Sequence, residues 1–200
     1  MSEILNVSIG IPAYNEGANI GKLISSLLAQ KQIGFRVSEI LVMADGCNDK
    51  TIEIVKSFNN PLIHLHPGNK RKGQQYRQNQ ILKLYKSDIL VLVEADTLPR
   101  NEYCLSEVLI PFQRNSNENI AVVVGESWPI SPSTFFEKIL HQNTQIQRKI
   151  LERYNHGNNL YLLCAGHSLR AFHRNFTDRL KWPLDVPEDA YAYLKLKELG

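Results

Sequence analysis

The sequence predicts an α/β fold with a mainly parallel central sheet flanked by helices, and three observations support this. Short apolar runs alternate with longer amphipathic runs, which is the rhythm of strand–helix–strand units. The chain has 200 residues and is 43% hydrophobic, so one core can form without a disulfide or metal. Residues 88–93 (DILVLV) are almost continuously apolar, as expected for a strand covered on both faces.

The spacing of apolar residues gives the expected elements in order. Residues three and four apart indicate a helix, as in 18–30, where Ile20, Leu23 and Ile24 share one face, whereas short apolar runs indicate strands. We expect a strand at 5–11, a helix at 18–30, a strand at 39–44, a helix capped by Asp49, a strand at 61–66, a polar helix within 70–85, a strand at 88–93, a helix at 102–114, a strand at 120–124, a helix at 133–154, short strands at 160–165 and 169–172, and a helix at 187–199.

Charge and cysteine usage exclude several classes of protein. A net charge of +3 is too weak to indicate nucleic acid as a partner. The cysteines Cys47, Cys104 and Cys164 are far apart and odd in number, which indicates reduced thiols. The sequence shows no signal peptide and no run of 18 apolar residues. We therefore expect a cytoplasmic protein, and peripheral attachment to the inner face of the membrane stays open.

The loop after the first strand is the first place to look for a site, because parallel sheets bind ligands at the carboxyl ends of their strands. It reads Pro12-Ala13-Tyr14-Asn15-Glu16. Pro12 fixes the backbone, Tyr14 offers a ring for stacking, and Glu16 can accept hydrogen bonds from ribose hydroxyls. The alternative is that Asn15 or Glu16 only serves the start of the next helix.

The loop after the second strand contains Asp45, Gly46 and Asp49. Gly46 permits a tight turn that leaves the Asp45 carboxylate facing the crevice. There it could accept a hydrogen bond from the imide N–H of uracil or the amide N–H of guanine. For Asp49 we favour a structural role in a turn and helix cap.

Two further acidic pairs follow in the sequence. Glu94 and Asp96 come directly after the apolar strand, and residues two apart in an extended segment share a face. A divalent cation bound to phosphate oxygens would neutralise them, and a solvated strand end is the alternative. Glu188 and Asp189 open the last helix, where the helix dipole alone favours acids, but a carboxylate base is the functional alternative.

These four loops, in this order, resemble the motifs of the family 2 glycosyltransferases. Residues 12–16 match P-x-Y-N-E, residues 45–49 match D-G-S-x-D with Cys47 in place of Ser, 94–96 resembles D-x-D, and Glu188-Asp189 resembles the late E-D pair. The resemblance implies the GT-A fold, a Rossmann-like nucleotide-binding fold. It also implies a single catalytic domain over 1–200, with a nucleotide-binding half (1–97) and an acceptor-side half (98–200).

The resemblance further implies a metal-dependent, inverting transfer of a sugar, a hexosyl or N-acetylhexosaminyl group, from a nucleotide-diphosphate sugar to a hydroxyl. A UDP-sugar is the favoured donor, and the acceptor is a saccharide or lipid-linked molecule of polysaccharide or glycoconjugate biosynthesis. Asp189 would be the catalytic base and Asp96 the ligand of Mg²⁺ or Mn²⁺. The implied donor-binding residues are Pro12, Ala13, Tyr14, Glu16, Asp45, Arg71, Lys72, Glu94 and Asp96.

The sequence departs from the family pattern in three places. Glu94 replaces the usual first Asp of D-x-D, so its role stays open. The family segment G-K-x-x-A-x-N reads here as residues 73–79 and lacks the lysine, so that Arg71 or Lys72 would supply the positive charge. The family usually continues with another strand and acceptor-side helices beyond Gly200, and we therefore expect a fragment of a longer protein.

Other classes of function stay in view. A non-catalytic nucleotide-sugar-binding module fits the same loops. A sugar-nucleotide pyrophosphorylase would need a Gly-rich loop after the first strand, which residues 12–16 do not provide. Trp128, Phe135 and Phe136 are expected in a core, with a sugar face or lipid acceptor as the alternative.

Overall fold

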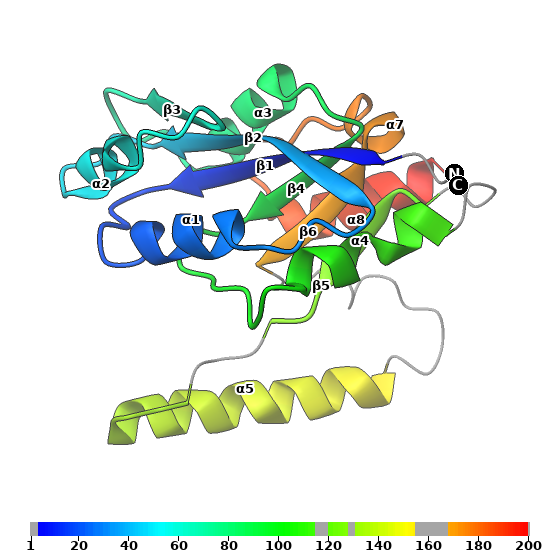
Figure 1. Ribbon diagram of the computed structural model, residues 1–200. Coiled ribbons are helices and arrows are strands. Elements are labelled where there is room, and N and C mark those ends of the chain that lie inside the picture. The colour runs from blue at the N-terminus through cyan, green and yellow to red at the C-terminus, as the bar shows by residue number, and fades with distance from the viewer. Residues whose placement is uncertain (1–3, 115–119, 128–130, 155–167, 200) are drawn as a thin grey trace.

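A computed structural model describes residues 4–114, 120–127, 131–154 and 168–199. Helices and strands alternate along these residues as the sequence predicts (Figure 1). In chain order they are β1 (Leu5–Ala13), α1 (Ile20–Leu28), β2 (Phe35–Ala44), α2 (Thr51–Ser57), β3 (Ile63–Pro67), α3 (Gln74–Leu84), β4 (Ile89–Val93), α4 (Cys104–Arg114), β5 (Val122–Gly125), α5 (Phe135–Tyr154), β6 (Leu169–His173), α7 (Arg174–Thr177) and α8 (Glu188–Glu198).

The strands form one sheet in the order β3-β2-β1-β4-β6-β5. Strands β1 to β4 are mutually parallel, which confirms the predicted α/β fold. Strand β6 runs antiparallel to β4, and β5 runs antiparallel to β6. This antiparallel edge was not predicted, because a short apolar run does not reveal the direction of its strand.

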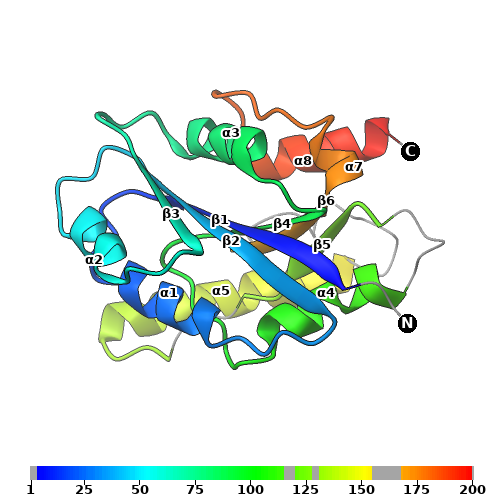
Figure 2. The same ribbon diagram turned by 45° about the horizontal axis from the view of Figure 1, so that its top comes forward.

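Helices cover both faces of the sheet and bury two apolar clusters. One cluster lies against α1, α2 and α4, and the other lies against α3, α7 and α8 (Figure 2). Helix α3 comes very close to β1 at Gly10, where a Cβ atom would lie 2.7 Å from the Ile81 side chain. A glycine at this position therefore lets α3 lie directly on the sheet beside the strand ends.

Several element boundaries differ from the predicted ones. Strand β1 extends to Ala13 and so includes Pro12. A proline is tolerated there because β1 pairs with β4 only as far as Gly10, so the hydrogen bonds between these two strands do not require an N–H from residue 12. Strand β4 ends at Val93 as predicted, whereas the short helix α7 was not predicted. The strand expected at 160–165 lies outside the described residues.

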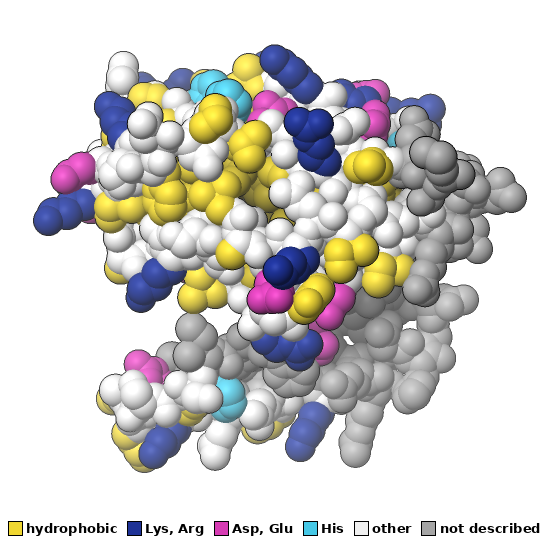
Figure 3. All heavy atoms as spheres, in the orientation of Figure 1, with side chains coloured by type: hydrophobic (Ala, Val, Ile, Leu, Met, Phe, Trp, Pro, Cys, Tyr) yellow, Lys and Arg dark blue, Asp and Glu magenta, His cyan; other side chains and the backbone are white. Residues whose placement is uncertain are grey.

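Helix α5 lies beside the α/β body instead of inside it (Figure 1). Its first residues, Phe135 and Phe136, are 74% and 79% exposed, so the expectation of a core position is wrong for both. Figure 3 shows hydrophobic side chains at the surface of this helix. Trp128 lies outside the described residues.

Among the described residues, no helix is both long enough and apolar enough to cross a membrane.

Candidate functional site

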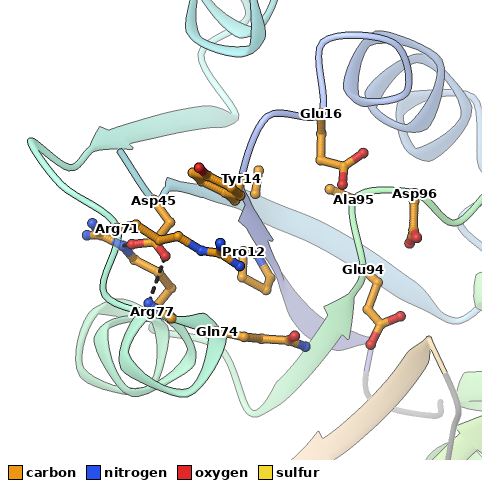
Figure 4. Close-up of a pocket in the computed structure, with 12 residues that line it drawn as sticks. Pro12, Tyr14, Glu16, Asp45, Arg71, Gln74, Arg77, Glu94, Ala95 and Asp96 are labelled. Atoms are coloured by element: carbon orange, nitrogen blue, oxygen red, sulfur yellow. Dashed lines mark hydrogen bonds and ion pairs between the residues drawn. The ribbon is translucent and has the colours of Figure 1, made fainter. Parts of the chain in front are cut away.

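A cavity of about 320 Å³ opens at the carboxyl ends of β1, β2 and β4 (Figure 4). Its volume is in the range of sites that hold small ligands. The guanidinium groups of Arg71 and Arg77 lie on one side, and Glu16, Glu94 and Asp96 lie on the other. The lining residues are Pro12, Ala13, Tyr14, Glu16, Asp45, Arg71, Gly73, Gln74, Arg77, Glu94, Ala95 and Asp96.

The fold therefore gathers residues that lie in four separate segments of the sequence. All the predicted donor-binding residues except Lys72 line this cavity. Asp189, the predicted base, does not line it. Its neighbour Glu188 links it to the cavity, because the Glu188 carboxylate accepts a hydrogen bond at 2.8 Å from Nε2 of the cavity residue Gln74.

The loop after β1 is held by the loop after β2. Asn15 adopts a left-handed conformation with φ of 56°, and its side-chain oxygen accepts a hydrogen bond from the Asn48 N–H at 2.9 Å. Glu16 serves the start of α1, since its Oε2 accepts from Asn19 at 2.8 Å, and it also lines the cavity. Glu16 can therefore hold the start of α1 and also face a ligand in the cavity. Asp49 has the turn role that we favoured, because it accepts hydrogen bonds from the N–H groups of Thr51 and Gly17, but the N-cap of α2 is Lys50, so the helix-cap part of the prediction is wrong.

Asp45 is buried and its carboxylate is held by three donors. Oδ1 accepts from the Lys72 N–H at 2.8 Å and from Arg77 Nε at 2.7 Å, and Oδ2 accepts from the Gly73 N–H at 2.8 Å. Burial raises the pKa of Asp45, but these donors outweigh it and place the pKa below its ordinary value. Gly46, with φ of 70°, lets the segment 70–73 reach Asp45, since a Cβ atom there would lie 2.5 Å from the Lys70 backbone.

Arg71 and Lys72 are neighbours in the sequence, but their side chains lie in different places. The Arg71 guanidinium lies 4.1 Å from the centre of the Tyr14 ring inside the cavity. The Lys72 ammonium instead lies over the ring of Tyr76 and donates to its hydroxyl at 3.0 Å. Of the two candidates for the missing lysine charge, the fold places Arg71 in the cavity.

Gly73, Gln74, Arg77 and Ala95 line the cavity but were not among the predicted site residues, and two of them occupy positions where the chain departs from the family segment. Gln74 stands at the lysine position and Arg77 at the alanine position of G-K-x-x-A-x-N. Arg77 is 5% exposed, and its Nη2 also donates to the Lys70 carbonyl at 3.2 Å. The departures themselves were the available signal, because a charged residue in place of alanine in a helix beside the sheet requires a buried partner.

The segment that carries Glu94 and Asp96 is a turn, not the end of a strand. The Thr97 N–H donates to the Glu94 carbonyl at 3.1 Å, and Ala95 is buried at the centre of the turn. Both acids nevertheless line the cavity. No cluster of three or more His, Cys, Asp or Glu side chains suited to a metal occurs among the described residues. Mg²⁺ is commonly held by one or two carboxylates together with substrate phosphates, and these two acids fit such an ion.

The Glu188-Asp189 pair shares one buried arginine as its ion-pair partner. Arg170 on β6 donates from Nη1 to Asp189 Oδ1 at 2.6 Å and from Nη2 to Glu188 Oε1 at 2.9 Å. The Arg170 side chain is 4% exposed, the Glu188 side chain 13% and the Asp189 side chain 27%. The sequence placed the two acids together but gave no sign of this partner.

Comparisons with solved structures agree with this architecture. The mannosyltransferase PcManGT of Pyrobaculum calidifontis, solved with GDP-Man and Mn²⁺, superposes with a TM-score of 0.69 at 20% identity, covering 97% of this chain and 52% of that one. TarS of S. aureus in complex with UDP-GlcNAc gives a TM-score of 0.66 at 19% identity, covering 96% of this chain and 53% of that one. The fold is therefore GT-A, as predicted.

Sequence comparison identifies the family. A 4,4'-diaponeurosporenoate glycosyltransferase of Staphylococcus haemolyticus is 32% identical over 112 residues, which cover 54% of this chain and 29% of that protein. The chain thus spans less than a third of the length of this relative. The model of the family described as glycosyl transferase family 2 matches residues 8–180. This match extends over most of the strands and helices described above, and the chain belongs to glycosyl transferase family 2.

Proposed function

We propose that this chain is the catalytic domain of an inverting, metal-dependent glycosyltransferase that uses a nucleotide-diphosphate sugar, with a UDP-sugar favoured. One observation carries the proposal: a single cavity joins an aromatic ring, a buried carboxylate, a guanidinium and an acidic turn at the carboxyl ends of three parallel strands. A nucleotide diphosphate needs these groups for its base, its phosphates and its counter-ion.

The donor would lie across the cavity from the arginine side to the acidic side. Tyr14 offers a ring face for the base, and Glu16 offers a carboxylate for the ribose. Asp96 would hold Mg²⁺ or Mn²⁺ together with the diphosphate oxygens, and such an ion offsets charge on the leaving diphosphate. Arg71 adds a positive charge on the opposite side of the cavity.

Free acceptor capacity on Asp45 favours uracil over guanine. A carboxylate has about four acceptor positions, and the chain already uses two on Oδ1 and one on Oδ2. Within the described part of the chain one position on Oδ2 is left, which suits the single imide N–H of uracil. Guanine presents two adjacent N–H groups, and these need both oxygens.

In the proposed reaction Asp189 accepts the proton of the acceptor hydroxyl. The hydroxyl oxygen forms a bond to C1 of the sugar as the bond from C1 to the diphosphate breaks, and the electron pair leaves with the nucleotide diphosphate. Because attack is opposite to the leaving group, the configuration at C1 inverts. Proton acceptance of this kind typically contributes about 10²–10⁴ in rate.

The acceptor is proposed to be a saccharide or a lipid-linked molecule, with action in the cytoplasm or at the inner face of the membrane. The S. haemolyticus relative bears the name of a 4,4'-diaponeurosporenoate glycosyltransferase, so this compound is one acceptor to include in a test. The exposed Phe135 and Phe136 on α5 offer apolar surface in the acceptor-side half.

The test measures nucleotide binding and turnover separately. Calorimetry with UDP, GDP and dTDP, with and without Mn²⁺, should give the tightest binding for UDP in the presence of the ion. Thymine carries the same imide N–H as uracil, so dTDP should lose only the contact of its ribose hydroxyl with Glu16. Binding without release of UDP from UDP-sugars and a panel of acceptors would identify a non-catalytic binding module, and tighter binding of GDP would contradict the proposed donor.

A further inference from the structure

The buried guanidinium of Arg170 lies where two acidic residues of α8 meet the sheet. On β6, Arg170 and Phe172 are two residues apart and therefore share a face, and Phe172 packs in the cluster under α3, α7 and α8. Arg170 is thus the charged residue of an otherwise apolar strand face. A buried guanidinium is retained only when carboxylates pair with it, and here one guanidinium serves both Glu188 and Asp189.

The two carboxylates have unequal surroundings. Glu188 Oε1 also accepts from Gln74 Nε2 at 2.8 Å and from Gln78 Nε2 at 3.2 Å, so three donors meet at this oxygen. Glu188 thereby anchors α8 to α3. Asp189 is about twice as exposed, at 27% against 13%, while Arg170 holds its Oδ1 at 2.6 Å. The pair therefore combines a fixed anchor with an acid that solvent can reach.

The same arginine connects α8 to the acidic turn. Arg170 pairs with Leu92 on β4, and the Glu94 N–H donates to the Ser168 carbonyl at 2.9 Å. Arg170 and Glu94 also line one narrow crevice beside the main cavity. The position of the Asp189 carboxylate relative to the turn 94–96 thus depends on the ladder between β4 and β6 and on the Arg170 side chain.

We propose that Arg170 is a positioning residue that holds the Asp189 carboxylate in place beside Glu188, which accepts a hydrogen bond from the cavity residue Gln74. This inference rests on the proposed function, in which Asp189 takes the acceptor proton. The guanidinium fixes one oxygen of Asp189, and its positive charge reduces the repulsion between the two adjacent carboxylates at the start of α8. Arg170 itself touches no part of the main cavity.

The experiment compares Arg170→Met and Arg170→Lys with wild type in the full chain. We measure kcat, the KM for the UDP-sugar, the Kd of UDP with Mn²⁺, and hydrogen exchange of the amides in 185–193. Arg170→Met should lower kcat up to about a hundredfold, because a small misplacement of a reacting group costs this much, with KM and Kd changed less than about threefold. Exchange in 185–193 should become faster, and Arg170→Lys should restore part of kcat.

Arg174→Met is the matched control. Arg174 is a partly exposed arginine that follows β6 directly, and it donates to the Ser87 carbonyl and stacks on Tyr85 away from the cavity. This control should lower the thermal midpoint while kcat and exchange in 185–193 stay near wild type.

The outcomes separate the positioning role from the function on which it rests. A wild-type kcat and unchanged exchange in Arg170→Met would overturn the inference. Equal losses of kcat and UDP affinity would also overturn it, since Arg170 would then support the whole fold. If wild type transfers no sugar at all, the proposed function fails, and hydrogen exchange still decides whether Arg170 holds α8. If Arg170→Met does not fold, Arg170→Lys provides the same comparison.

Discussion

Two buried arginines, Arg77 on α3 and Arg170 on β6, form ion pairs with different numbers of carboxylates. Arg77 pairs with Asp45, and both side chains are at most 6% exposed. Arg170 pairs with both Glu188 and Asp189, and Asp189 stays 27% exposed. One arginine per carboxylate keeps the Asp45 side chain buried, whereas one arginine is shared by Glu188 and Asp189, of which Asp189 is the more exposed.

The largest expected effect concerns Asp189, the proposed proton acceptor. Asp189→Asn should lower kcat by about 10²–10⁴, because an amide cannot take the proton, while UDP affinity stays within about twofold. Steady-state kinetics and calorimetry measure the two quantities. Asp178→Asn, a change at an exposed acid paired with Arg174, is the control and should alter neither. Near-normal turnover of Asp189→Asn would show that Asp189 is not the base.

The next effect concerns the acidic turn. Asp96→Ala should remove the gain in UDP affinity that Mn²⁺ provides, a loss of at least about tenfold or 1.4 kcal/mol. Glu94→Gln is the matched comparison and tests the open role of the residue that departs from D-x-D. Calorimetry with and without Mn²⁺ separates them, and equal enhancement by the ion in Asp96→Ala and wild type would contradict the metal assignment.

A smaller effect appears as a dependence of stability on pH. The pKa of Asp45 in the folded chain lies below its ordinary value of 3.8, so the unfolded chain binds this proton more readily. Asp45 therefore stabilises the fold fully above the ordinary value, and this contribution is lost as the pH falls through the lowered pKa. Urea unfolding should give a difference between wild type and Asp45→Asn that is constant above about pH 5 and shrinks below it. A constant difference down to pH 3 would contradict the role of Arg77 and the loop amides.

The smallest effect separates the two neighbouring basic residues. Arg71→Ala should weaken UDP binding by several-fold, about 1 kcal/mol, because a guanidinium stacked on an aromatic ring contributes up to roughly this much at an exposed site. Lys72→Ala should have a smaller effect, since its ammonium lies on Tyr76 outside the cavity lining. Titration calorimetry of both variants decides the comparison, and a larger loss for Lys72→Ala would reverse the assignment.

Most of the fold could be predicted because local spacing determines it. Strand β4 and helix α1 were located within two residues at each end, since both carry an unambiguous apolar pattern. The antiparallel direction of β6 and the helix α7 could not be predicted, because the direction of a short strand depends on its neighbours in the sheet. The exposure of Phe135 and Phe136 could likewise not be predicted, since their apolar side chains indicated a position in the core.

The candidate site, like the fold, could be predicted from the sequence only in part. The four acid-bearing loops were found from the sequence because each follows an apolar strand or opens a helix, and three of them line one cavity. The fourth, with Asp189, reaches it only through Gln74 and Glu188. Glu94 and Asp96 were expected at a strand end and instead occupy a turn beyond Val93.

By itself, the sequence determined the strand–helix order, the position of each acidic loop along the chain and the family to which those loops point. Only the tertiary structure decided which cation meets which carboxylate: Arg77 with Asp45, 32 residues apart, and Arg170 with Glu188 and Asp189. The reason is physical. Hydrophobic periodicity is a local property that can be read along the sequence. A buried charge, by contrast, is stable only when a partner from elsewhere in the chain lies within hydrogen-bond distance.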